Sequence, residues 1–142
     1  MHLRLFSWPV PSHFPTEIQA LCNELCGLPD QEAAVRRAHE ILSNRFRARK
    51  WMTYPLLWKI FDRDLNRIWK RTEFLHCTHM NWLLKIVLVH SGKFAERDVQ
   101  ERWTFLSGIS PHQYSRVRLK DGRMINVDVW ASTYGIPFGG HA

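Results

Sequence analysis

Hydrophobic residues in the first part of the chain recur at the three- and four-residue spacing of a helical face. Residues 16–26 are predicted to form a helix, with Thr16 as N-cap, Gln19 completing a capping box, and Gly27 at its end. The apolar face of this helix comprises Ile18, Leu21, Cys22, Leu25 and Cys26. Because both thiols share that face, we expect them to be buried and inert, not to form a metal-binding pair.

Two further helices are predicted before the middle of the chain, after an irregular arm over residues 1–14. Asp30 is expected to cap the first of them, which extends to about Lys50. The second begins at Pro55, and a single apolar face holds Leu57, Ile60, Phe61, Leu65 and Ile68.

The segment from Thr78 to His90 is apolar on nearly all sides. A helix of this kind is usually buried, so we expect it to lie at the centre of the fold. Ser91 and Gly92 end it. The following residues, Phe94 to Leu106, are predicted to form a fifth, amphipathic helix.

The character of the chain changes after Gly108. Residues 114–119 and 123–129 are β-like and flank a Lys-Asp-Gly turn, which indicates a hairpin. The tail from Tyr134 to Ala142 is rich in glycine and is expected to be loose. Helices followed by strands in one chain of this length predict an α+β fold with residues 1–142 as a single domain.

The turn determines which side chains of the hairpin share a face. A two-residue turn of Asp121 and Gly122 would place His112 and Asp128 on opposite faces. A type I turn with Gly122 as a left-handed bulge would instead place Asp128 opposite Tyr114, with His112 one diagonal step away on the same face. An Asp directly before Gly favours the second turn.

Composition and charge restrict the compartment and the partners. The chain has 142 residues, 45% of them hydrophobic, and a formal net charge of +7. The basic stretch from Arg36 to Lys50 is interleaved with apolar residues, which favours the solvated side of a helix over a nucleic-acid surface. The apolar run from Trp82 to Val89 is too short to span a membrane, and residues 1–11 do not form a secretory leader. We therefore expect a cytoplasmic protein with free thiols and no membrane partner.

Cys77, His112 and Asp128 are the residues with candidate chemistry. Cys77 lies where an irregular segment meets the start of the buried helix, and a helix N-terminus favours a thiolate and offers N–H groups to an oxyanion. His112 opens the first predicted strand, and Asp128 lies near the end of the second. In this arrangement Cys77 would be the nucleophile, His112 the base and Asp128 the residue that orients the base.

These residues resemble the transglutaminase-like superfamily in their order along the chain. The matching segments are LHCTHMNWLLK, SPHQYSRVRL and DGRMINVDVW, which cover roughly the C-terminal half. The resemblance implies a small, bacterial-type, single-domain member with a papain-like fold and a Cys-His-Asp triad. It further implies acyl transfer or hydrolysis at a protein or peptide amide, with no cofactor or metal. The chain departs from the family pattern at His76, Tyr114 and Val129.

Residues around the triad are candidates to contact the substrate or its oxyanion. They are Thr78, His76, Gln113 and Trp69, with Trp51 and Trp58 as alternatives to Trp69. His76, His79 and His90 fit no standard zinc spacing. Two other functions stay open: a non-catalytic transglutaminase-like module that binds a protein, and a basic nucleic-acid-binding domain. The sequence does not indicate an oligomeric state.

Overall fold

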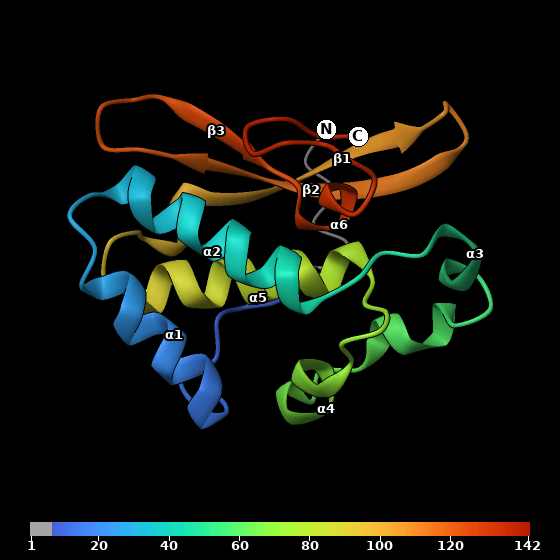
Figure 1. Cartoon of the computed structure of the whole chain (residues 1–142), viewed down its shortest axis with the longest axis horizontal. Coiled ribbons are helices and arrows are strands. Elements are labelled where there is room, and N and C mark those ends of the chain that lie inside the picture. Colours follow the sequence, from blue (N-terminus) through green and yellow to red (C-terminus); the bar gives the residue numbers. More distant parts are fainter. Residues whose placement is uncertain (1–6) are drawn as a thin grey trace.

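The computed structural model describes residues 7–142 as a mixed α+β fold, in which helices precede a three-stranded antiparallel sheet (Figure 1). The α+β class predicted from the sequence is therefore confirmed. The elements in chain order are α1 (Thr16–Cys26), α2 (Gln31–Arg45), α3 (Lys50–Thr53), the 3₁₀ helix η1 (Leu57–Phe61), α4 (Leu65–Lys70), α5 (Cys77–His90), the 3₁₀ helix η2 (Glu96–Asp98), β1 (Val99–Leu106), β2 (Ser110–Arg118), β3 (Met124–Val127) and α6 (Val129–Ser132).

Helix α5 lies at the centre of the molecule, as its uninterrupted apolar pattern predicts. Every residue from Thr78 to Leu88 is buried. Helices α1 and α2 and strand β2 all pack against α5, which lies below the sheet in Figure 1. Because α5 is held by both helices and the sheet, its first residue, Cys77, has a fixed position relative to the sheet.

One charged side chain is buried within this core. Lys85 of α5 forms an ion pair of 2.6 Å with Glu101 of β1, and both side chains are almost wholly shielded from solvent. The Ser7 hydroxyl also donates to Glu101. The Lys85 ammonium therefore has its counter-charge inside the protein, which is what a buried cation requires.

The β2–β3 hairpin has the register that the Asp-Gly turn predicts. Ser115 pairs with Val127 and Arg118 with Met124. The Gly122 N–H donates to the Leu119 carbonyl, and Gly122 has a φ of 91°. Glycine adopts this left-handed backbone without the steric cost that a Cβ atom would bring. The predicted type I turn with a glycine bulge is confirmed.

The predicted fifth helix is wrong. Residues 99–106 form strand β1, which pairs with β2 from Val99 opposite Val117 to Leu106 opposite Ser110. Only the short η2 turn before it is helical. The spacing of hydrophobic residues in this segment is compatible with a helix. If residues 99–106 were helical, however, one edge of β2 would have no strand to pair with. The hydrogen bonds of the sheet therefore override a weak local preference.

Two helix boundaries in the first half differ from the prediction. Asp30 caps α2 by accepting from the Ala33 N–H, as expected, but α2 ends at Arg45 and does not reach Lys50. Beyond it the backbone is extended, and Phe46 and Ala48 alternate into the core. At the start of α1, Thr16 is not the N-cap, because Pro15 takes that position without a side-chain cap.

The helix predicted from Pro55 is also wrong. The segment contains the 3₁₀ turn η1 and, after a break, the separate helix α4. The Asp64 side chain accepts from two N–H groups and caps α4, which ends any continuous helix before it. Consequently Ile60, Leu65 and Ile68 are buried, whereas Phe61 is 69% exposed.

The C-terminal tail packs against the sheet and is not loose. Gly139 forms a bridge with Asn126, and the His141 ring stacks on the Tyr114 ring at 4.0 Å. The tail thereby covers the polar face of the hairpin, while Val117 and Val127 on the other face are fully buried in the core. Both faces of β2 are thus shielded. Within residues 7–142 no helix is long and apolar enough to cross a bilayer.

Candidate active site

Cys77 is the first residue of α5, and its side chain is half-buried. His76 is the N-cap with extended backbone, but its side chain does not bond to the first turn. The leading N–H groups of the helix therefore lack a side-chain cap. Such groups carry partial positive charge, which stabilises a thiolate or an oxyanion placed beside them.

His112 lies on β2 and is held by Asp128. Its Nε2 lies 2.7 Å from Oδ2 of Asp128, and both side chains are buried. Asp128 is itself fixed, because its Oδ1 accepts from the Ala131 N–H as the cap of α6 and its Oδ2 accepts from the Ala142 N–H. The carboxylate that orients the ring is thus anchored by three hydrogen bonds.

Cys77 meets the other side of the same ring. Burial lowers the pKa of His112, but hydrogen bonds with Asp128 and Cys77 and their negative charges outweigh it and raise the pKa to about 9. The ring is therefore positively charged at neutral pH. Since Nε2 donates to Asp128, Nδ1 is the nitrogen left to donate to the Cys77 sulfur. The three side chains predicted as a triad lie in contact, while their catalytic roles stay a prediction.

A cavity of about 310 Å³ opens beside Cys77 and His112. Its lining comprises Lys50, Thr53, Tyr54, His76, Cys77, Leu106, Ser107, Ile109, Ser110, Pro111, His112 and Trp130. The Tyr54 and Ser110 hydroxyls share a hydrogen bond of 2.7 Å that joins the α3 region to the β1–β2 turn. Trp130 packs its ring 5.0 Å from the His112 ring and shields it from solvent. The cavity is large enough for a side chain or an acyl group.

The residues predicted to contact substrate are only partly gathered at this cavity. His76 lines it, and Thr78 follows Cys77 with its hydroxyl buried and without a partner among residues 7–142. Gln113 lies on the opposite face of β2, where its Oε1 accepts from Asn81, so it does not face the cavity.

The tryptophan candidates lie outside the cavity lining. Trp69 is buried against the Phe46 ring, at 5.6 Å between centroids. Trp51 and Trp58 are 71% and 67% exposed on the surface. None of the three is placed to stabilise an oxyanion at Cys77.

The two histidines beside Cys77 are neutral. Burial lowers the pKa of His76, helped by the charges of Arg71 and Lys59, and its Nε2 contacts the Thr53 carbonyl at 3.1 Å. Burial also lowers the pKa of His79 to about 4. In the part of the chain that the structure describes, no cluster of three His, Cys, Asp or Glu side chains could hold a metal ion.

The thiols of α1 differ from each other. Cys22 is fully buried, and burial raises its pKa to about 11, whereas Cys26 is exposed. Cys26 lies about 80° around the helix from Ile18, at the edge of the apolar face, and in the last turn. The prediction of two buried thiols is therefore confirmed for Cys22 and wrong for Cys26.

A buried polar network behind the site was missed from the sequence. Asn81 donates to Gln113 and accepts from the Ser115 hydroxyl at 3.1 Å, so α5 and β2 are joined directly below Cys77 and His112. Asn81 lies one helical turn after Cys77, and a lone amide in an apolar helix was the available signal. Tyr54, Ser110 and Trp130 gave no such signal, because only the fold brings them to the cavity.

Comparisons with models of known protein families, with curated proteins and with solved structures find no match to this chain. The geometry and chemistry of the site are therefore the basis for a proposed function.

Proposed function

We propose that the chain is a thiol-dependent enzyme of the transglutaminase-like kind, which transfers or hydrolyses the acyl group of a protein or peptide amide. The observation that carries this proposal is the buried His112 ring, which contacts Asp128 through Nε2 and also forms a hydrogen bond with Cys77. Burial of a charged imidazole costs free energy unless neighbouring groups compensate its charge, and here a carboxylate and a thiol lie against the ring. Its position at the wall of an open cavity supports a chemical role.

In the proposed first step the Cys77 thiolate attacks the carbonyl carbon of the amide. A carbon–sulfur bond forms, and the carbonyl π electrons move onto oxygen. His112 then gives its Nδ1 proton to the amide nitrogen as the carbon–nitrogen bond breaks, which leaves a thioester and a free amine.

In the second step water or an amine attacks the thioester. His112 accepts a proton from the attacking group, and the sulfur leaves as thiolate. Asp128 keeps the ring oriented throughout and stabilises it when it is charged. The N–H groups at the start of α5, including that of Thr78, are proposed to hold the oxyanion of both steps.

We further propose that the fold is papain-like. Three features support it: a cysteine at the N-terminus of a central helix, a histidine on an antiparallel strand, and an aspartate directly after the neighbouring strand. In this arrangement the helix and the sheet each contribute one reacting group, so their packing aligns the pair.

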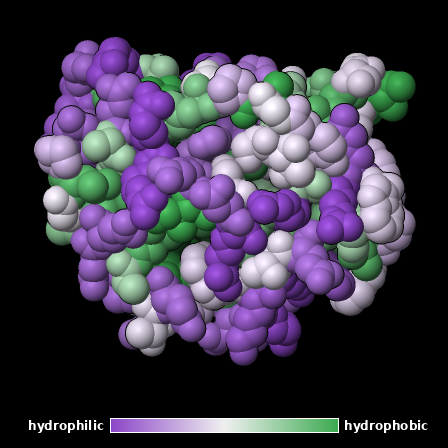
Figure 2. Space-filling view, viewed as in Figure 1, coloured by the Kyte–Doolittle hydropathy of each residue, from purple (hydrophilic) through white to green (hydrophobic). Residues whose placement is uncertain are grey.

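A polypeptide substrate is supported by the rim of the cavity. Tyr54 and Ile109 line it and are 60% and 84% exposed. Figure 2 shows hydrophobic atoms on the surface at the end of the β1–β2 hairpin, at the upper right, on a face that is otherwise largely hydrophilic. Exposed apolar groups next to a reactive cavity are suited to hold a chain on either side of the cleaved bond.

The nucleic-acid alternative has less support. Five of the arginines are paired with carboxylates of this chain in exposed ion pairs, namely Arg36, Arg37, Arg67, Arg118 and Arg123. Much of the positive charge is thus already balanced locally.

Alkylation of Cys77 by iodoacetamide at pH 7 tests the enzyme proposal. We expect Cys77 to react faster than Cys26, although Cys26 is more exposed, because the His112 ring that contacts Cys77 is proposed to favour the thiolate form. In His112→Ala the order should reverse. Mass spectrometry of labelled peptides gives both rates, with Cys26→Ser as control. If Cys26 reacts first in the wild type, Cys77 is not activated, and the non-catalytic module becomes the better interpretation.

A further inference from the structure

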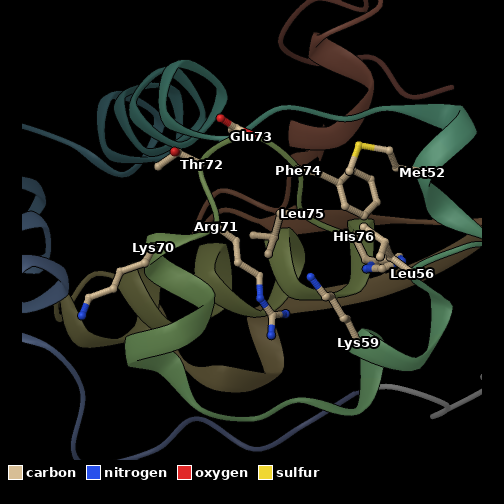
Figure 3. Close-up of a pocket in the computed structure, with 10 residues that line it drawn as sticks. All are labelled: Met52, Leu56, Lys59, Lys70, Arg71, Thr72, Glu73, Phe74, Leu75 and His76. Atoms are coloured by element: carbon tan, nitrogen blue, oxygen red, sulfur yellow. The ribbon is translucent and has the colours of Figure 1, made fainter.

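A second cavity is lined by His76 but not by Cys77. Its volume is about 340 Å³, and it is drawn in Figure 3. The side chains that line it are Met52, Leu56, Lys59, Lys70, Arg71, Thr72, Glu73, Phe74, Leu75 and His76. His76 lines both cavities, so the two spaces adjoin at the residue before Cys77.

Positive charge gathers in one part of this cavity. Figure 3 shows Lys59 and Arg71 directed toward the same region, whereas Lys70 points away from it and Glu73 lies at the opposite side of the view. Lys59 is half-buried and forms no ion pair with any of residues 7–142. Both Lys59 and Arg71 lie close enough to His76 to lower the pKa of its ring.

Arg71 has unused hydrogen-bonding capacity here. Its Nη2 pairs with Asp62, but its Nη1 is buried and has no partner in the described structure. Asp62 also forms an ion pair with Arg67, so a single carboxylate neutralises part of the charge of two guanidinium groups. An unpaired buried donor is costly unless a ligand satisfies it. Met52, Leu56 and Phe74 supply an apolar wall, as in sites that hold a small ligand with one charged end.

We propose that this cavity binds a carboxylate of the substrate, with Lys59 as the donor and the Arg71 guanidinium as a second positive charge beside it. The inference rests on the proposed reaction at Cys77 and specifies its substrate. The amide that Cys77 attacks belongs to a molecule with a carboxylate near the cleaved bond, on the side of His76. The apolar wall contacts the carbons between the two groups.

Matched alkylating reagents test the proposal. Bromoacetyl-glycine, bromoacetyl-β-alanine and bromoacetyl-4-aminobutyrate are each compared with the corresponding neutral amide, and the rate of Cys77 modification is measured. For at least one arm length we expect the carboxylate to react about tenfold faster than the amide, because charge-assisted hydrogen bonds are strong. Lys59→Gln should lower this ratio toward one. Lys120→Gln, in the exposed β2–β3 turn and outside the lining of this cavity, should leave it unchanged.

The His112 imidazolium attracts every carboxylate equally in all these variants, so only a loss specific to Lys59→Gln reports on the cavity. A ratio near one at every arm length in the wild type overturns the proposal. The same holds for a ratio that Lys59→Gln and Lys120→Gln change to the same extent.

A second measurement separates this inference from the reaction at Cys77. In Cys77→Ser, NMR follows the His76 ring while succinate or inorganic phosphate is added. Binding of succinate that raises the pKa of His76, and is lost in Lys59→Gln, supports a carboxylate site even if Cys77 proves unreactive and the proposed function fails. No change with succinate, or a change with phosphate alone, overturns it.

Discussion

His112 contacts both of the other residues of the candidate triad, Asp128 and Cys77. Its ring is buried, yet it is positively charged at neutral pH, because Asp128 and Cys77 both form hydrogen bonds with it and raise its pKa to about 9. Two properties of the protein depend on this ring: the reactivity of Cys77 and the response of folding stability to pH.

Asp128→Asn tests whether the carboxylate orients the base. Asparagine can still accept from the Ala131 N–H and cap α6, so the fold should survive. The amide cannot stabilise a charged ring and permits the wrong tautomer, so Cys77 alkylation at neutral pH should slow by about tenfold to a thousandfold. Alkylation rates against pH give the measurement, with Asp121→Asn in the exposed turn as control. Superimposable profiles of wild type and Asp128→Asn would show that the third triad position is misassigned.

The raised pKa of His112 also predicts how stability varies with pH. An unfolded histidine titrates near its ordinary value of 6.5, whereas the folded ring has a pKa of about 9. Between these values the folded His112 ring holds one more proton than the unfolded ring. The contribution of this ring to folding stability is therefore complete below about pH 6.5 and is lost as pH rises through 9, on the order of 1–3 kcal/mol in total.

Urea unfolding at pH 6, 7.5 and 9.5 measures this effect in Cys77→Ser and in the double variant Cys77→Ser/His112→Asn, so that the thiol does not contribute to the pH dependence. The double variant should lack this fall in the free energy of unfolding, although it will be less stable throughout. A parallel fall in both proteins would assign the pH dependence to other groups.

At the scale of elements, the β2–β3 turn determines whether the site exists. Only the glycine-bulge register brings His112 and Asp128 to one face of the hairpin. A Cβ atom at Gly122 would meet nothing within 4 Å, so the cost of a substitution there is purely that of a left-handed backbone.

Gly122→Ala should lower the free energy of unfolding by about 1–2 kcal/mol. Gly27→Ala is the matched control, because Gly27 has a φ of −77° and its added methyl would make only ordinary contacts. Urea denaturation compares the two variants. Equal stability changes would mean that the turn does not depend on the positive φ of Gly122.

On the scale of the whole molecule, the cavity is built from parts far apart in the sequence. Residues after α2, the start of α5, the β1–β2 turn and α6 all contribute to its lining. Ile109 at the hairpin end is the most exposed of the large hydrophobic side chains described. A role in binding would explain why it is kept in solvent.

Ile109→Ser should raise KM for a peptide substrate about three- to tenfold, because the apolar contact with the substrate is lost. The rate of Cys77 alkylation by iodoacetamide, which is too small to reach the rim, should not change. Met124→Ser, at an exposed position on β3, is the control and should alter neither value. A KM that is the same in both variants and in the wild type would remove Ile109 from the substrate-binding surface.

The sequence by itself determined the features that depend on neighbouring residues. The central helix follows from its apolar run, the Asp30 cap from local hydrogen bonding, and the β2–β3 register from the backbone preference of Gly122. The pairing of His112 with Asp128 could be predicted because it requires only that register and the alternation of side chains along a strand.

Only the tertiary structure decided the features that depend on distant residues. Strand β1 forms because it pairs with the edge of β2. The tail is ordered because it packs against the hairpin, where Gly139 bridges to Asn126. The meeting of Cys77 with His112 requires α5 to pack against β2, and no local pattern encodes that distance. Local propensities are too weak to outweigh the hydrogen bonds and buried area that such contacts supply, so local patterns predicted the parts of the site, and only the family resemblance predicted that Cys77 joins them.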